Sequence, residues 1–559
     1  MKTEPDRASR PAKPRQWTGW ELAALIAIIA IAAAIRLWHI DFGLPALNDP
    51  DEPLFVTTAL DMLRERRLNP EWFGHPATIL FYALAAIFAI IGWVGTVAGQ
   101  WPDAAGYVSA VYADPSIAIL PMRLFISVTA LGCIYLTYRI GRDAVGPLVG
   151  LAAAALLACN GLHIELSQVI RTDMLASLFM LWSCRFAMCA ADGGRVRDHI
   201  LTGVMLGLGG ATKWPALLFI VNAPGAILHR WRQTGWRRSV ALLPVAAVAA
   251  VMTLCLASPY LLLDHATVLR DLGGEARTAH PGSTGGSPAH NLLWYARHIL
   301  IVGFGPVGAI LAVIGLMIAP WNARRLALAG LPGAFLFLAG IAGQSLVWER
   351  WAVPLLPWIA LAIAIALDAI ARRIRPRWRP LALGGALAVL LLPMVASALS
   401  RSWMRAHDTR QMASQWVRNH IPETQSLLIE DVAFDLIARP GAVLFPMGDA
   451  GCVDVHQLLK AEPSYRQVGE KRAGKAIVDL GNVAPERIAS CHTQFAIITH
   501  YERYRQEAET FPQQFAQYRA LMQNGQILAT FRPIPGIQGG PTTYVVRRAA
   551  RDMVSDARR

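Results

Sequence analysis

Long apolar segments, separated by short clusters of arginine, occupy the chain up to about residue 400. The first run, Leu22 to Ile35, is flanked by Trp17, Trp20 and Trp38, so the stretch 19–40 is long enough to cross a bilayer with these rings at its surfaces. Applied along the chain, the same criterion predicts eleven crossings, near 19–40, 121–140, 145–162, 170–190, 199–212, 213–229, 239–258, 292–317, 326–344, 351–371 and 381–400.

The arginine clusters orient these crossings. They recur in the N-terminal tail and near 139–142, 195–197, 230–238, 324–325 and 372–379. Because lysine and arginine accumulate in cytoplasmic loops, all of the clusters should lie on one side. This requirement predicts that the apolar segment 76–98 is an interfacial or re-entrant helix on the outer side. No lysine or arginine occurs between Arg67 and Arg123, as expected of an outer loop. The N-terminus is therefore expected in the cytoplasm.

The pattern changes after about residue 400, where short alternating runs replace the long apolar ones. Helical periodicity is present in 408–420 and 502–523, and 426–430, 495–499, 526–533 and 542–547 are typical of strands. We therefore expect a cytoplasmic tail (1–18), a transmembrane domain (19–400) with a first outer loop (41–120), and a small extracytoplasmic α/β domain (401–559). Cys452 and Cys491 fall in this last domain and can pair if it faces an oxidising compartment.

The composition excludes a single soluble domain. Of the 559 residues, 54% are hydrophobic and only 16% are charged, which is typical of a polytopic α-helical membrane protein. The net charge of +14 arises largely from the arginine clusters between apolar segments. We interpret this charge as topology, and no nucleic-acid partner is expected.

Three carboxylates, Asp49, Asp51 and Glu52, follow the outer end of the first predicted crossing. Charge is costly at a membrane surface and is usually retained for a function. A structural alternative is a capping box, with Asp49 as N-cap, Pro50 at the first helical position and Glu52 at the third. The two interpretations are compatible, because a cap needs only some of the carboxylates.

Other ionisable residues recur at the outer ends of crossings. Arg171 and Asp173 open the fourth predicted crossing, where Asp173 as an N-cap and a snorkelling Arg171 are the structural alternative. Arg123 opens the second crossing, Lys213 lies between the fifth and sixth, and Arg350 opens the tenth. Each cation by itself is explained as an interface anchor, but several cations directed at one outer site predict an anionic ligand.

The order of several short motifs resembles that of the GT-C membrane glycosyltransferases, in particular family 39, which includes protein O-mannosyltransferases and lipid A aminoarabinose transferases. The matching pieces are Asp51-Glu52, Asn69-Pro70 with Phe73 and His75-Pro76, Met122-Arg123, Arg171 with Asp173, Thr212-Lys213-Trp214, Ser258-Pro259-Tyr260 and Glu349-Arg350-Trp351. The resemblance covers about residues 30–420 and implies a GT-C fold with an interfacial helix after the first crossing. The chain departs where mannosyltransferases carry an Asp before a His-Pro-Pro run, since it has Glu71 and then His75-Pro76-Ala77.

The resemblance implies a sugar donor linked to polyprenyl phosphate and transfer to an acceptor hydroxyl with inversion. The phosphate leaves without a general acid, so one carboxylate base suffices, whereas a carboxylate pair would be needed for a covalent intermediate. We predict Asp51 as the base. The other predicted roles are orientation of base or acceptor for Glu52 and Asp173, binding of the donor phosphate for Arg123, Arg171, Lys213 and Arg350, and loop contacts with the donor for His75, Arg270 and Arg277.

No metal or other cofactor is expected. The acids Asp49, Asp51, Glu52 and Asp173, together with His75, offer ligands for a divalent ion, but no spacing among them is diagnostic, and the resemblance implies a metal-independent reaction. Expected partners are the polyprenyl-phosphate sugar, membrane lipid and an acceptor that is a protein, a lipid or a glycan. The expected location is the cytoplasmic (inner) membrane, with a periplasmic C-terminal domain. A transporter and a noncatalytic envelope-assembly protein are the rival classes, although a transporter would place its ions near the midplane.

Overall fold

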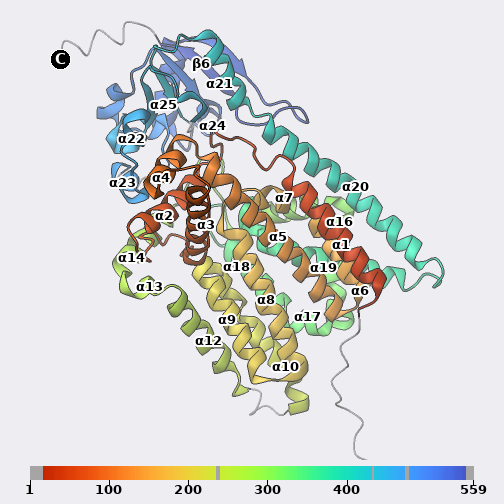
Figure 1. Ribbon diagram of the computed structural model, residues 1–559. Coiled ribbons are helices and arrows are strands. Elements are labelled where there is room, and N and C mark those ends of the chain that lie inside the picture. The colour runs from red at the N-terminus through yellow and green to blue at the C-terminus, as the bar shows by residue number, and fades with distance from the viewer. Residues whose placement is uncertain (1–16, 235–239, 431–433, 473–476, 549–559) are drawn as a thin grey trace, which may run out of the picture.

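A bundle of apolar helices carries a small α/β domain at one end in the computed structural model, which describes residues 17–234, 240–430, 434–472 and 477–548 (Figure 1). Residues 1–16 of the predicted cytoplasmic tail and part of the arginine cluster at 230–238 lie outside the described residues. The helices of the bundle and its outer loops are α1 (Gly19–Leu37), α2 (Glu52–Arg64), α3 (Thr78–Val97), α4 (Ala104–Ala113), α5 (Ser116–Ala144), α6 (Pro147–Ala158), α7 (Gly161–Ser167), α8 (Thr172–Gly193), α9 (Val196–Thr212), η1 (Trp214–Val221), α10 (Asn222–Thr234), α12 (Leu243–Ala257), α13 (Tyr260–Leu263), α14 (His265–Glu275), α15 (Pro288–Tyr295), η2 (Ala296–Val302), α16 (Gly303–Asn322), α17 (Arg324–Ala329), α18 (Leu331–Ala342), η3 (Glu349–Leu355), α19 (Leu356–Ala371) and α20 (Arg379–Ala406).

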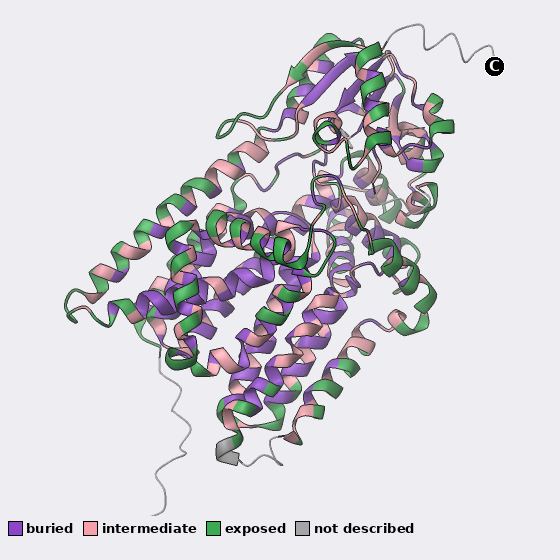
Figure 2. Cartoon of the chain, turned by 180° about the vertical axis from the view of Figure 1, so that it is seen from behind, coloured by how far each residue is buried: buried purple, intermediate pink, exposed green. Residues whose placement is uncertain are grey.

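Each of the eleven predicted crossings falls on a helical segment. Among the described residues, seven helices are long and apolar enough to cross a membrane, or eight if the bent pair α6 and α7 counts as one span. Several other crossings are interrupted. Lys213 separates α9 from the 3-10 helix η1, and Pro215 in the first turn of η1 lacks the amide proton that a continuing α-helix requires. Figure 2 shows the buried residues concentrated inside the bundle and the sheet, while α20 is exposed along much of its length.

Helix α3 is long and apolar enough to cross a membrane, but contacts at its start and after its end link it to other parts of the chain. At its start, the hydroxyls of Thr78 and Ser258 are 2.6 Å apart, which joins α3 to the end of α12. After its end, α4 packs back on α3 through the ring of Tyr107. The hydroxyl of Tyr112, five residues further along α4, donates to the carbonyl of Pro463 in the C-terminal domain at 2.9 Å. The structure therefore places α3 in the part of the bundle nearer the C-terminal domain (Figure 1).

The C-terminal domain is a six-stranded mixed sheet, in the order β3-β2-β1-β4-β6-β5, between two layers of helices. Strands β2, β1 and β4 are parallel, and the other neighbours are antiparallel. Its elements are α21 (Thr409–His420), β1 (Leu427–Ile429), η4 (Phe434–Leu436), β2 (Val443–Pro446), η5 (Gly448–Ala450), β3 (Cys452–Asp454), α22 (Val455–Lys460), α23 (Tyr465–Lys471), η6 (Leu480–Asn482), η7 (Pro485–Cys491), β4 (Phe495–Ile498), α24 (Tyr501–Gln506), α25 (Pro512–Asn524), β5 (Gln526–Phe531) and β6 (Thr543–Arg547).

The predicted helix 408–420 and the four predicted strands of this domain are confirmed, but the single helix predicted at 502–523 is wrong. The chain instead forms α24 and α25, which are separated before Pro512. A proline at the first position of a helix disfavours helical geometry in the residue before it. Alternating side chains divide the core: Ile429 packs toward α21 on one face of the sheet, and Leu428 packs toward α25 on the other. A disulfide joins Cys452 and Cys491.

Candidate active site

The acidic loop after α1 has a different local structure from the predicted capping box. Helix α2 begins at Glu52, and Asp51 precedes it without making a side-chain cap. The carboxylate of Asp49 accepts a hydrogen bond from the amide of Asp51 at 2.9 Å, which closes a turn before the helix. The capping-box alternative is therefore wrong. The cause is a tertiary contact, because Asp49 is also bound by Arg171, the residue that precedes α8.

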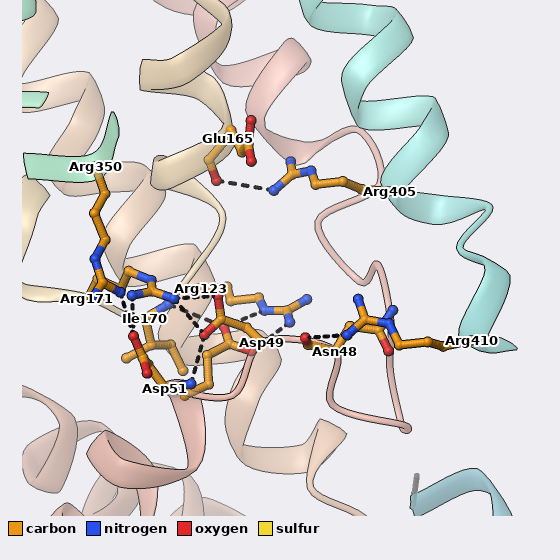
Figure 3. A network of polar contacts seen from close by, with 11 residues as sticks. Asn48, Asp49, Asp51, Arg123, Glu165, Ile170, Arg171, Arg350, Arg405 and Arg410 are labelled. Atoms are coloured by element: carbon orange, nitrogen blue, oxygen red, sulfur yellow. Dashed lines mark hydrogen bonds and ion pairs between the residues drawn. The ribbon is translucent and has the colours of Figure 1, made fainter. Parts of the chain in front are cut away.

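Two arginines from separate helices converge on this loop (Figure 3). Arg171 donates to both carboxylate oxygens of Asp49, at 3.0 and 2.9 Å, and also pairs with Asp51. Arg350, at the start of η3, donates to Asp51 at 2.5 Å. The side chain of Asp51 is nevertheless 39% exposed, whereas that of Asp49 is 14% exposed. Asp51 is therefore the carboxylate of this loop that a ligand reaches most readily.

Glu52 has the opposite environment from its neighbour. It forms a two-pronged ion pair with Arg123 of α5, at 2.8 and 2.7 Å, and both side chains are fully buried. The guanidinium of Arg123 also donates to the carbonyls of Ile40 and Phe42, at 2.8 and 2.9 Å. Arg123 was predicted to bind the donor phosphate, but the structure leaves its side chain no exposed surface. The pair connects α5, the loop after α1 and the first turn of α2.

A second acid and cation pair lies near the first. Lys213, in the break between α9 and η1, donates to Asp173 at 2.5 Å. Asp173 was considered as an N-cap, but the helix α8 is preceded by Arg171 in extended geometry, and Asp173 lies within its first turn. The cap interpretation of Asp173 is wrong because its carboxylate is taken by Lys213.

His75 lies between these two pairs. Its Nδ1 is 3.5 Å from the hydroxyl of Thr172, the residue between Arg171 and Asp173. Burial, followed by the positive charges of Lys213 and Arg171, lowers the pKa of His75 to about 3, and Asp51 offsets part of that effect. His75 is therefore neutral at ordinary pH, and charges from both pairs act on its ring. Asp51 and Asp173 are also connected through the chain, because Arg171, which pairs with Asp51, is two residues before Asp173.

The two predicted loop arginines have different positions. Arg277, after α14, bonds Glu275 at 3.1 Å and is close enough to His75 for its charge to contribute to the lowered pKa of that ring. Arg270 instead pairs with its neighbour Asp271 at 2.9 Å, and its side chain is 65% exposed. The structure therefore does not bring Arg270 to the site, because a closer acid holds its guanidinium on the surface of α14.

Other residues of the site were not predicted as such. The guanidinium of Arg350 lies over the ring of Trp348, 4.7 Å from its centroid, and His280 packs edge-on against the same ring. Asn48 bonds Gln411 and Arg410 of α21, more than 350 residues away. Trp348 could have been found from its place beside Arg350, but no local pattern in the sequence connects Asn48 with α21.

Most acids of the site are engaged by cations, and within the described ranges no group of three His, Cys, Asp or Glu side chains is arranged to hold a metal ion. Asp51 is the most accessible carboxylate of the site, and Arg171, Arg350 and Lys213 are its cations. Chemically, such an arrangement can accept a proton from a hydroxyl and stabilise an anionic leaving group.

The family model described as dolichyl-phosphate-mannose-protein mannosyltransferase matches residues 116–262. This match runs from α5 into α13 and includes Arg123, Arg171, Asp173 and Lys213 of the site. The match spans less than half of the chain, so it shows that this part is similar to the family and supports the predicted class of multi-pass membrane glycosyltransferase. A comparison with curated protein sequences finds no match.

Solved structures show an overall likeness at low sequence identity. ArnT from Cupriavidus metallidurans bound to undecaprenyl phosphate is 14% identical, with 96% of this chain and 99% of that chain covered and a TM-score of 0.47. The Archaeoglobus fulgidus oligosaccharyltransferase tethered to an acceptor peptide is 12% identical, with 94% and 74% covered and a TM-score of 0.48. The S. cerevisiae protein O-mannosyltransferase complex bound to its sugar donor is 18% identical, with 46% and 35% covered and a TM-score of 0.32. At TM-scores below 0.5, these likenesses do not bear on the chemistry of this chain.

Proposed function

We propose that this protein transfers a sugar from a polyprenyl-phosphate donor to an acceptor hydroxyl on the outer face of the cytoplasmic membrane, with inversion and without a metal. The single observation that carries the proposal is the exposed carboxylate of Asp51 among the cations of α8 and η3. The donor class follows from the matched family, whose description contains a sugar on dolichyl phosphate. A lipid-linked donor also explains why the site lies at the end of a membrane bundle.

Asp51 is the general base in this reaction. The acceptor oxygen attacks the anomeric carbon as its proton passes to the Asp51 carboxylate, and the bond between that carbon and the phosphate oxygen breaks. The electron pair leaves with the polyprenyl phosphate, which needs no proton from the enzyme. A single displacement of this kind inverts the anomeric centre, and no second carboxylate acts as a nucleophile.

Arg350 is the cation best suited to change partners. Among the described residues, Asp51 is the only carboxylate that pairs with it, whereas Arg171 is also held by both oxygens of Asp49. We expect the donor phosphate to draw Arg350 away from Asp51, since guanidinium binds phosphate in a fork geometry. That exchange frees the base when the donor arrives. Lys213 and Arg277 border the same site and add positive charge toward the leaving group.

The proposed location is the cytoplasmic membrane, with the N-terminus in the cytoplasm and the C-terminal domain in the periplasm. Helices α10 and α17, which adjoin two of the arginine clusters, lie at the end of the bundle opposite the C-terminal domain (Figure 1). Positive loops on the cytoplasmic side would then place that domain outside. The Cys452–Cys491 disulfide fits an oxidising compartment.

The test compares lipid extracts of cells with and without the gene by mass spectrometry. Cells without the protein should accumulate an unspent polyprenyl-phosphate sugar, and restoring the wild-type chain should remove it. The Asp51→Asn variant should fold, reach the membrane and leave the donor pool as high as in the deletion. Asp41→Asn is the matched control, because Asp41 is an exposed acid of the same outer loop.

Two outcomes would overturn the proposal. An unchanged pool of lipid-linked sugars in the deletion would exclude this donor class. Full restoration by Asp51→Asn would exclude Asp51 as the base and would favour a noncatalytic assembly protein, which needs only the fold.

A further inference from the structure

The acidic loop is held by the C-terminal domain as well as by the bundle. The side-chain amides of Asn48 and Gln411 form a reciprocal pair, with Asn48 Nδ2 donating to Gln411 Oε1 at 2.8 Å and Gln411 Nε2 donating to Asn48 Oδ1 at 2.6 Å. Asn48 is 8% exposed and lies three residues before Asp51. Gln411 lies in the first turn of α21, so this contact joins the two halves of the molecule beside the proposed base.

Arg410 strengthens the same contact. Its guanidinium donates to the backbone carbonyl of Asn48 at 3.0 Å, as Figure 3 shows. It is oriented by a two-pronged pair with Asp408, at 3.0 and 2.8 Å. Asp408 also caps α21 by accepting the amide of Arg410 at 2.9 Å. Arg410 thus binds the backbone carbonyl of Asn48, and the next residue, Gln411, binds its side-chain amide.

Helix α21 is itself anchored to the sheet domain. The amide of Thr409 donates to the carbonyl of Gly539 at 3.0 Å, and its hydroxyl donates to the carbonyl of Pro541 at 2.6 Å. These carbonyls belong to the segment that leads into β6. A displacement of α21 would therefore also have to move the segment before β6 or break these hydrogen bonds.

The other side of the Asn48 side chain is closed by backbone. Gly43 has φ +67°, and a Cβ built on it would lie 2.7 Å from the Cγ of Asn48. Asn48 therefore packs directly on a glycine that lacks a side chain, while Gln411 binds its polar atoms. Each side-chain amide donates one hydrogen bond to the other and accepts one, which offsets the cost of burying the amide of Asn48.

We propose that Gln411 is a positioning residue for sugar transfer, acting through Asn48 to set the place of Asp51. This inference rests on the proposed function, because it takes Asp51 as the base. Arg171 and Arg350 hold the carboxylate of Asp51 from the bundle, and the Asn48–Gln411 pair holds the backbone that carries it from the domain. A misplacement of about 1 Å at a reacting group lowers the rate about 100-fold. The C-terminal domain is thereby part of the catalytic geometry.

The experiment measures the rate at which donor is consumed when the detergent-solubilised full-length protein is added to membranes from deletion cells. These membranes supply the accumulated donor and the unmodified acceptor. Gln411→Ala should lower kcat by about 10-fold to 100-fold, with the KM for donor unchanged within about twofold, because the cations remain. The exchanged pair, Asn48→Gln with Gln411→Asn, keeps the number of side-chain carbons and should recover most of the rate. Gln415→Ala, on the exposed face of the same helix, is the control.

The outcomes separate this inference from the proposed function. If Asp51→Asn is inactive while Gln411→Ala has the wild-type rate per folded molecule, the positioning role is wrong and the proposed base stands. If Asp51→Asn keeps its rate, the proposed function itself fails. A Gln411→Ala defect that the exchanged pair does not relieve, or that affects only the amount of folded protein, also overturns the positioning role.

Discussion

The neighbouring acids Asp51 and Glu52 should respond in opposite ways to loss of charge. Glu52→Gln keeps the size of the side chain but leaves Arg123 buried without a counter-charge. Asp51→Asn removes a carboxylate that is 39% exposed and leaves Arg171 paired with Asp49. The first change should therefore reduce stability strongly, and the second should mainly reduce turnover.

The expected loss in the free energy of unfolding depends on how deeply the ion pairs of Glu52 and Asp51 are buried. Removing one partner of a buried ion pair costs about 3–5 kcal/mol. The lower end, about 3 kcal/mol, applies to Glu52→Gln, because the new amide oxygen still accepts one hydrogen bond and the carbonyls of Ile40 and Phe42 still bind Arg123. A partly exposed pair such as that of Asp51 contributes about 1 kcal/mol or less. The two variants should therefore differ by at least about 2 kcal/mol in the free energy of unfolding.

The assay is denaturant unfolding of the solubilised protein in one detergent, with the midpoint and slope compared between variants. A shift of midpoint at constant slope reports a change in stability of the folded state. Equal unfolding midpoints for Glu52→Gln and Asp51→Asn would contradict the predicted difference in stability. It is also refuted if Asp51→Asn proves to be the less stable of the two.

Three further changes test other contacts of the described residues. Lys213→Met strands the Asp173 carboxylate and should cost about 3 kcal/mol, and adding Asp173→Asn should recover part of that loss. Burial raises the pKa of Asp61 to about 6, so the stability linked to its proton is complete below about pH 4 and is lost as the pH rises through about 6; Asp61→Asn should flatten this part of the curve of unfolding midpoint against pH. Replacing Cys452 by serine opens a loop of 39 residues and should destabilise the C-terminal domain by about 4 kcal/mol, as measured by limited proteolysis under oxidising conditions.

Each of these three predictions has a result that would contradict it. A double variant at 213 and 173 no more stable than Lys213→Met would mean that the charge of Asp173 is not the cause. Parallel curves for wild type and Asp61→Asn between pH 4 and 6 would show that this carboxyl does not titrate there. For Cys452→Ser, the wild-type protein under reducing conditions is the control, and equal protease resistance in all samples would show that the disulfide adds no stability.

Much of the fold was predictable because the bilayer imposes a simple rule on sequence. An uninterrupted apolar run such as Leu22 to Ile35 has few alternatives to a helix in lipid, where every backbone polar group must be bonded within the segment. The arginine clusters predicted that 76–98 and the C-terminal domain lie on the same side, and α3 is linked to that domain through α4. Strands β2 and β3 were not predicted, because runs of three or four residues carry too little periodicity to be recognised.

The sequence predicted which residues belong to the site better than it predicted which acid pairs with which cation. The sequence identified five of the candidates, because ionisable residues at the ends of apolar segments are costly and usually functional. They are Asp51, Asp173, Arg171, Lys213 and Arg350. Which acid meets which cation was not visible, and the capping interpretations of Asp49 and Asp173 were wrong because local spacing cannot show a competing arginine or lysine from another helix.

The order of residues alone predicted a membrane bundle, the acids and cations at the ends of its apolar segments, and a following α/β domain, because hydrophobicity and charge act residue by residue against the solvent. Only the folded chain distinguishes the exposed Asp51 from the buried Glu52 beside it, and only the folded chain joins Asn48 to Gln411. Burial and pairing depend on which helices are neighbours in space. The contact between Asn48 and Gln411 spans more than 350 residues of chain, a distance over which no local pattern carries information.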